Sequence, residues 1–120
     1  MQAALLNDAY ATLRDPFLRA EYLLRLRGGP SAAEHKTVPA GFLAEMLELR
    51  GEIESALENK DVERVRRLKA DLDGRLKREL DRIGGFFRQS SAPEVLRGIR
   101  ERLNVAAYLR GLLRDLQEAD

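Results

Sequence analysis

The most constraining feature of this sequence is a long row of apolar residues with helical spacing in its second half. Between positions 65 and 83, apolar residues recur every three or four positions, which is the period of one helix face. The row consists of Val65, Leu68, Leu72, Leu76, Leu80 and Ile83. It predicts a long amphipathic helix from Val62 to about Ile83, with Asp61 as its N-cap and Gly84-Gly85 weakening its end.

Prolines and glycines divide the first part of the chain. Asp15-Pro16 separates a helix expected over residues 1–14 from a second helix that runs to about Arg27. Gly28-Gly29-Pro30 then stops the second helix, and residues 31–38 are expected to form a loop. This region is therefore predicted to hold two short helices and a linker.

Cap signals and apolar spacing predict two further helices. Thr37 is the expected N-cap of a third helix over residues 39–58, whose first turn contains a proline. Ser91 is the expected cap of the last helix, with Pro93 in the first turn and Glu94 completing a capping-box pattern. The last helix carries the apolar series Leu96, Ile99, Leu103, Ala106, Leu109 and Leu113.

These elements predict an all-α fold. Strand-like alternation is absent, and short turns between helices favour antiparallel neighbours. Residues 39–120 are therefore expected to form an antiparallel three-helix bundle. The helices of residues 1–30 would form a separate N-terminal arm, joined to the bundle by the linker at 31–38. A length of 120 residues supports one domain with a small helical appendage.

Composition argues against several classes of protein. The 21 Lys and Arg residues balance 20 Asp and Glu residues, for a net charge of +1, whereas nucleic-acid binders are usually clearly basic. Cysteine is absent, which excludes disulfides and thiolate chemistry from this segment. No apolar run approaches the length of about 20 residues that spans a bilayer, and the N-terminus lacks a secretory signal pattern. We expect a cytoplasmic protein that binds neither nucleic acid nor membrane.

Catalytic chemistry is not indicated by any group of residues. His35 is the only histidine, and it lies in the expected loop, where a solvated side chain is the simpler interpretation. Glu45, Glu48 and Glu52 have helical spacing and form either a carboxylate patch or, as we favour, a solvated acidic face. The basic run consists of Arg64, Arg66, Arg67 and Lys69, and it is interpreted as an outward helix face. The sequence predicts that this protein is not an enzyme and uses no metal or cofactor.

The third helix has more apolar surface than a bundle core requires. Its core row is Phe42, Met46, Leu49, Ile53 and Leu57. Leu43 and Leu47 form a second apolar row, with Ala44 beside them and charged residues at its border. A second apolar row is typical of a helix that also contacts something outside its own bundle.

The last helix shows a similar excess. On a helical wheel, Tyr108 points roughly 140° away from the row that contains Ile99 and Ala106. Val105 and Leu112 are expected to flank Tyr108 on this side, away from the core. Tyrosine combines a large apolar ring with a polar tip, which suits an interface. Two alternatives remain: these residues bind a partner, or they pack against the N-terminal arm and widen the core.

Three stretches of the sequence resemble one family. Residues 5–24 are similar to the end of a J-domain, where most J-domains have the pattern NxAYxxLxDPxxRxxYD, and RAEYLL at 19–24 is similar to the version found in HscB-type proteins. The segment FLAEMLELR at 42–50 resembles the FLMExxELRE signature of that family. AYLRGLL at 107–113 resembles its terminal RYLxxLL helix. The chain thus resembles HscB-type J-protein co-chaperones of iron–sulfur cluster assembly over nearly its whole length.

This resemblance implies an adaptor function. HscB-type proteins deliver an IscU-type cluster scaffold to a DnaK-like chaperone, HscA, and the scaffold binds exposed residues of the first and last helices of the C-terminal bundle. Carried over to this chain, the partner-binding positions are Leu43, Ala44, Leu47, Glu48 and Tyr108. They include the residues that the helical wheels separate from the core. A monomer is expected.

The chain also departs from the family pattern. Gly51 and Ser55 stand where the family often has acidic residues, and Ala44 replaces a larger apolar residue. The resemblance covers only the end of the J-domain, and the sequence contains no His-Pro-Asp tripeptide, which in the family stimulates ATP hydrolysis by the chaperone. We therefore expect a fragment or truncated form that keeps scaffold binding without stimulating an ATPase.

Two other functions remain open from the residues alone. A helical interaction or self-association module unrelated to iron–sulfur assembly would use the same apolar rows, and light scattering at several concentrations distinguishes it from a monomer. A nucleic-acid-binding bundle would show affinity that falls steeply with salt.

Overall fold

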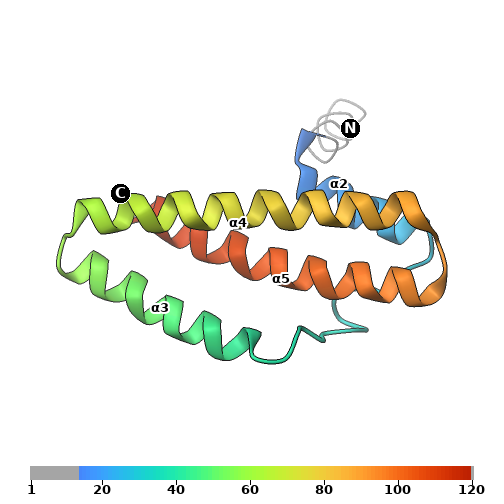
Figure 1. The fold of residues 1–120 in the computed structure, drawn as a ribbon, viewed down its shortest axis with the longest axis horizontal. Helices are drawn as coiled ribbons and strands as arrows, with labels where there is room; N and C mark the ends of the chain where they lie inside the picture. The colour runs from blue at the N-terminus through green and yellow to red at the C-terminus, as the bar shows by residue number, and fades with distance from the viewer. Residues whose placement is uncertain (1–13, 120) are drawn as a thin grey trace, which may run out of the picture.

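A computed structural model describes residues 14–119, and these residues form helices without any strand (Figure 1). The helices are α2 (Pro16–Leu26), α3 (Phe42–Glu58), α4 (Val62–Gln89) and α5 (Pro93–Glu118). The predicted all-α fold is confirmed. The helix expected over residues 1–14 lies, apart from its last residue, outside the described part of the chain.

The two longest helices, α4 and α5, form an antiparallel hairpin (Figure 1). Helix α3 runs parallel to α5, because Phe42 lies against Tyr108 while Arg50, two turns later, lies 3.9 Å from Asp115. Helix α3 covers one half of the hairpin. Helix α2 covers the other half, near the turn between α4 and α5.

Most of the buried hydrophobic residues form two clusters, one for each half of the hairpin. The first lies between α3, α4 and α5 and contains Phe42, Met46, Ile53, Ala56, Leu68, Leu72, Val105, Leu109, Leu112 and Leu116. The second lies between α2, α4 and α5 and contains Leu24, Ile83, Phe87, Leu96, Ile99 and Leu103. Helix α2 therefore completes the core of the second half, as α3 does for the first.

Polar contacts fix the N-terminal segments on α5. The guanidinium of Arg100, which is 2% exposed, donates to both carboxylate oxygens of Glu21 in α2, at 2.6 and 2.8 Å, and to Oδ1 of Asn104. The side-chain amide of Asn104 donates to the backbone carbonyls of His35 and Thr37, each at 3.0 Å. The linker and α2 are thus joined to one face of α5. The domain boundaries at residues 30 and 38 stay predictions.

Carboxylates cap two of the helices: the cap predicted at Asp61 is confirmed, whereas the cap at Asp15 is a finding of the structure. Asp15 accepts hydrogen bonds from the N–H groups of Phe17 and Leu18 at the start of α2, where Pro16 occupies the first turn as expected. Asp61 accepts from the N–H of Arg64 and caps α4. Both carboxylates satisfy N–H groups that have no partner within the helix.

The caps predicted at Thr37 and Ser91 are wrong. The Thr37 carbonyl is held by α5, and the chain turns through Gly41, whose φ of 82° suits glycine, so α3 begins only at Phe42. Ala92 is the N-cap of α5 and makes no side-chain cap bond, while its N–H donates to Oγ of Ser90.

Helix α4 extends beyond the end predicted near Ile83 and continues through Gly84-Gly85 to Gln89. Each glycine costs about 1 kcal/mol relative to alanine in a helix. Burial of Phe87 against α2 offsets this cost, and the guanidinium of Arg27 donates to the Phe87 carbonyl at 2.7 Å. Packing against another helix therefore decides where α4 ends.

Candidate partner-binding surface

Helix α3 turns its second apolar row to solvent. Leu43 is 53% exposed and Leu47 is 73% exposed, whereas Phe42 and Met46, one position earlier in each case, are buried. A step of one residue rotates the side chain by about 100° around the helix, which is enough to move it from the core to the surface. Ala44 and Glu48 are exposed on the same helix.

Tyr108 of α5 lies beside the start of α3. The residue is 44% exposed, and its ring meets the ring of the buried Phe42 edge to face, with centroids 5.7 Å apart and planes at 83°. This arrangement suits the quadrupoles of two aromatic rings. Because Phe42 directly precedes Leu43, the five predicted site residues lie on α3 and on the part of α5 that adjoins its first turn. We call Leu43, Ala44, Leu47, Glu48 and Tyr108 the α3–α5 patch.

Two flanking residues were assigned to the wrong side of α5. Val105 and Leu112 were predicted to lie away from the core beside Tyr108, but they are 3% and 2% exposed and belong to the core formed with α3. The helical wheel identified the row of α5 that faces its hairpin partner. It did not show that α3 packs in parallel against the neighbouring side, which widens the buried face.

The α3–α5 patch has the composition of a protein contact. Two leucines supply apolar area without hydrogen-bonding groups, and the tyrosine adds a rigid ring with a polar end. Charged side chains adjoin its apolar residues: Glu48 within the patch, and the exposed ion pair between Arg50 and Asp115 beside it. Exposed apolar groups with a charged border are typical of a surface that binds another macromolecule.

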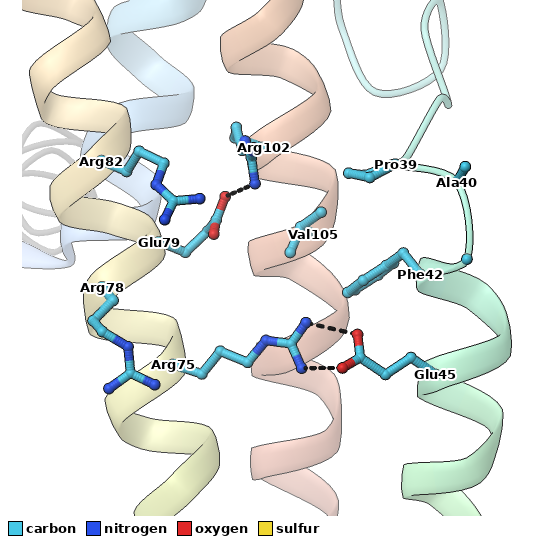
Figure 2. A pocket seen from close by; sticks show the side chains of 11 residues that line it. Pro39, Ala40, Phe42, Glu45, Arg75, Arg78, Glu79, Arg82, Arg102 and Val105 are labelled. Atoms are coloured by element: carbon cyan, nitrogen blue, oxygen red, sulfur yellow. Dashed lines mark hydrogen bonds and ion pairs between the residues drawn. The ribbon is translucent and has the colours of Figure 1, made fainter.

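Of the three glutamates predicted to form an acidic face, Glu48 and Glu52 lie on the outer side of α3, and Glu45 does not. Glu45 points toward α4, where the guanidinium of Arg75 donates to its two carboxylate oxygens at 2.8 and 3.1 Å (Figure 2). These hydrogen bonds lower the pKa of Glu45 and outweigh the opposing effect of desolvation. Glu48 and Glu52 remain exposed on the outer side of α3. The three carboxylates therefore do not converge on one site.

Residues 14–119 contain neither a candidate metal site nor a helix suited to span a membrane. No group of three or more His, Asp or Glu side chains is arranged to hold a metal ion there. None of the helices in the same residues combines the length and apolar character needed to cross a membrane.

Comparison with known proteins identifies the family. The model of the "HSCB C-terminal oligomerisation domain" matches residues 38–117, which include α3, α4 and nearly all of α5. The chain belongs to the HscB family. The resemblance stated from the sequence motifs is thus confirmed.

Several HscB relatives carry the name "Co-chaperone protein HscB homolog". The relative from Burkholderia mallei (strain SAVP1) is 36% identical over 96 residues, which cover 79% of this chain and 55% of the relative. The relative from Vibrio cholerae serotype O1 (strain ATCC 39541) is 56% identical over 55 residues, or 45% of this chain and 32% of the relative. The chain thus spans about half the length or less of these relatives. No solved structure matches it.

Proposed function

We propose that this chain binds an IscU-type iron–sulfur scaffold protein through the α3–α5 patch. In the full-length cytoplasmic protein, it would present this scaffold to a DnaK- or HscA-type chaperone. The main support is the exposure of Leu43 and Leu47 beside Tyr108, in a chain of the HscB family. In the resemblance described above, these are the positions that contact the scaffold.

The proposed mechanism is binding without catalysis. A folded scaffold would cover the two leucines and the tyrosine ring, removing apolar area from water. A J-domain on the same polypeptide would hold the chaperone nearby, which raises its effective concentration at the bound scaffold. The fixed packing of α2 on α5 would transmit a defined orientation between the two partners, since Arg100 and Leu24 are almost fully buried at that contact.

The test replaces both leucines of the patch. The variant Leu43→Ser with Leu47→Ser should weaken scaffold binding by at least about 30-fold in calorimetry, because loss of central interface anchors typically costs about 2 kcal/mol or more. The matched control is Leu26→Ser with Val62→Ser, since these residues are 63% and 67% exposed outside the patch. The control should bind like the unmodified chain.

Stability measurements separate a binding role from a core role. Both double variants should keep their helicity, with free energies of unfolding within about 0.5 kcal/mol per site of the unmodified chain, as is usual for exposed positions. Unchanged scaffold binding by the Leu43/Leu47 variant, with the fold intact, would refute the proposal.

Self-association is the second candidate function, because the description of the matching family refers to oligomerisation. It would use the same exposed leucines as a contact between copies of the chain. We propose a monomer. Light scattering between low and high micromolar concentration should give a constant mass of one chain. Self-association would be favoured instead if the mass rises with concentration and the variant Leu43→Ser with Leu47→Ser returns it to the mass of one chain.

A further inference from the structure

A second surface begins on the other side of Phe42. The Arg75 guanidinium lies over the Phe42 ring at 5.8 Å from its centroid, and beyond it a groove of about 670 Å³ opens between the start of α3, the middle of α4 and α5 (Figure 2). Phe42 thus contributes to this groove and also contacts Tyr108 of the α3–α5 patch. We call the groove the arginine groove.

The lining of the arginine groove has an excess of positive charge. Its charged side chains are Arg75, Arg78, Arg82 and Arg102 together with Glu45 and Glu79. Both carboxylates are already used within the protein. Glu45 accepts two hydrogen bonds from Arg75, and Glu79, which is 8% exposed, accepts from Arg102 at 3.3 Å (Figure 2).

Two guanidinium groups of the groove are left without an acidic partner. Arg78 and Arg82 are exposed and form no ion pair or hydrogen bond with the described residues. In Figure 2, Arg82 extends from α4 toward the side of Glu79, whereas Arg78 lies lower along α4. Guanidinium groups are well suited to carboxylates because their N–H groups match the two carboxylate oxygens.

The start of α3 adds to this positive field. Its N-cap is Gly41, which provides no side-chain acceptor, and the one acidic residue of its first turn, Glu45, is already paired with Arg75, so the positive end of the helix dipole meets the groove without a free carboxylate from the first turn of α3. Pro39, Phe42 and Val105 supply apolar lining between the charges. The groove therefore offers cationic groups together with apolar contacts for methylene groups.

We propose that the arginine groove binds an acidic segment of a partner protein, with its carboxylates on Arg78 and Arg82. The two arginines are four residues apart, about 6 Å along the axis of α4, which matches two separate carboxylate side chains better than one compact phosphate. The apolar lining favours glutamate or aspartate side chains with their methylene groups over a free inorganic anion. This proposal uses residues outside the α3–α5 patch and does not depend on scaffold binding.

A labelled peptide tests the proposal directly. Fluorescein-labelled hexaglutamate should bind the chain saturably in fluorescence anisotropy at low salt, where exposed ion pairs are least screened. The variant Arg78→Gln with Arg82→Gln should weaken this binding about tenfold, since two exposed pairs contribute up to about 1 kcal/mol each. The control Arg67→Gln with Arg97→Gln removes the same charge at two exposed arginines outside the groove, and it should bind within about twofold of the unmodified chain.

Three results would overturn the proposal. The first is the absence of saturable peptide binding by the unmodified chain. The second is an equal loss of affinity in both double variants, which would mean attraction by net charge alone. The third is displacement of the peptide by inorganic phosphate but not by sodium chloride of equal ionic strength, because a phosphate group would then be the preferred occupant. Circular dichroism of each variant verifies that the fold is retained.

Discussion

Helices α2 and α3 complete opposite halves of the same hairpin, and each is linked to it by an Arg–Glu pair with two hydrogen bonds. At the α2 end, Arg100 and Glu21 have side chains that are 2% and 30% exposed. At the α3 end, Arg75 and Glu45 have side chains that are 35% and 53% exposed. The same pair of groups therefore has a fully buried arginine and a partly buried glutamate at one end, whereas both partners are largely solvated at the other.

This difference in burial gives the two pairs different roles: the Arg100–Glu21 pair holds α2 in place, whereas the Arg75–Glu45 pair contributes little to holding α3. A buried pair is poorly replaced by water, so breaking it leaves an uncompensated charge and α2 is held in one orientation. An exposed pair contributes little to stability because water and salt screen it. The start of α3 consequently depends on apolar packing through Phe42 and Met46. The two proposed binding surfaces flank this start: the α3–α5 patch lies on the side of Tyr108, and the arginine groove lies on the side of Arg75.

The largest expected effect comes from breaking the buried pair. Glu21→Ala leaves the Arg100 charge without its carboxylate, and the free energy of unfolding should fall by about 3–5 kcal/mol. Urea denaturation measures this loss. The double variant Glu21→Met with Arg100→Met should recover most of it, since apolar residues of similar size often replace a buried pair without penalty. A loss below about 1 kcal/mol in Glu21→Ala would show that the two ends of the hairpin do not differ as described.

Truncating a core side chain in either half should lower the free energy of unfolding by a similar amount, but each change should loosen a different helix. Leu24 in the α2 cluster is 1% exposed, and Ile53 in the α3 cluster is 4% exposed. Replacing either one by alanine should lower the free energy of unfolding by about 2–4 kcal/mol. Hydrogen exchange should then accelerate mainly in α2 for the first variant and mainly in α3 for the second. Equal acceleration in both helices for either variant would mean that the halves open as one unit.

A smaller effect is expected where the linker meets α5. Asn104→Ala removes two hydrogen bonds to the carbonyls of His35 and Thr37 as well as the acceptor for Arg100. The expected loss is about 1–3 kcal/mol, because partly buried groups are left unsatisfied. Ser31→Ala is the comparison: its hydroxyl accepts from the N–H of Glu34 at an exposed turn of the same linker, and the change should cost under about 0.5 kcal/mol.

The smallest effect concerns the exposed pair and depends on pH. Hydrogen bonds from Arg75 lower the pKa of Glu45 in the folded state below its ordinary value of 4.5. The pair therefore stabilises the fold above about pH 4.5 and loses this contribution as pH falls through the lowered pKa. Glu45→Gln should be less stable than the unmodified chain by under about 1 kcal/mol at neutral pH, and the two should converge in acid. A difference that grows as pH falls would contradict this assignment.

Each helix of the protein was determined largely by the residues within it and next to its ends. The row from Val65 to Ile83 predicted α4, and the prolines at 16 and 93 marked the first turns of α2 and α5. The separation of Leu43 and Leu47 from the core row of α3 was also predicted from spacing, because adjacent helical residues point about 100° apart. Their exposure follows from the same geometry.

Contacts between distant segments were decided only by the tertiary structure. Glu21 and Arg100 are 79 positions apart, and no local pattern indicates that they pair. Burial of Val105 and Leu112 required the parallel packing of α3, and the extension of α4 through Gly84-Gly85 required α2. The arginine groove likewise arises from three helices together. The sequence thus determined the helices and the outward side chains of α3, whereas the packing of α2 and α3 on the hairpin decided how much of α5 is buried and which surfaces remain free to bind.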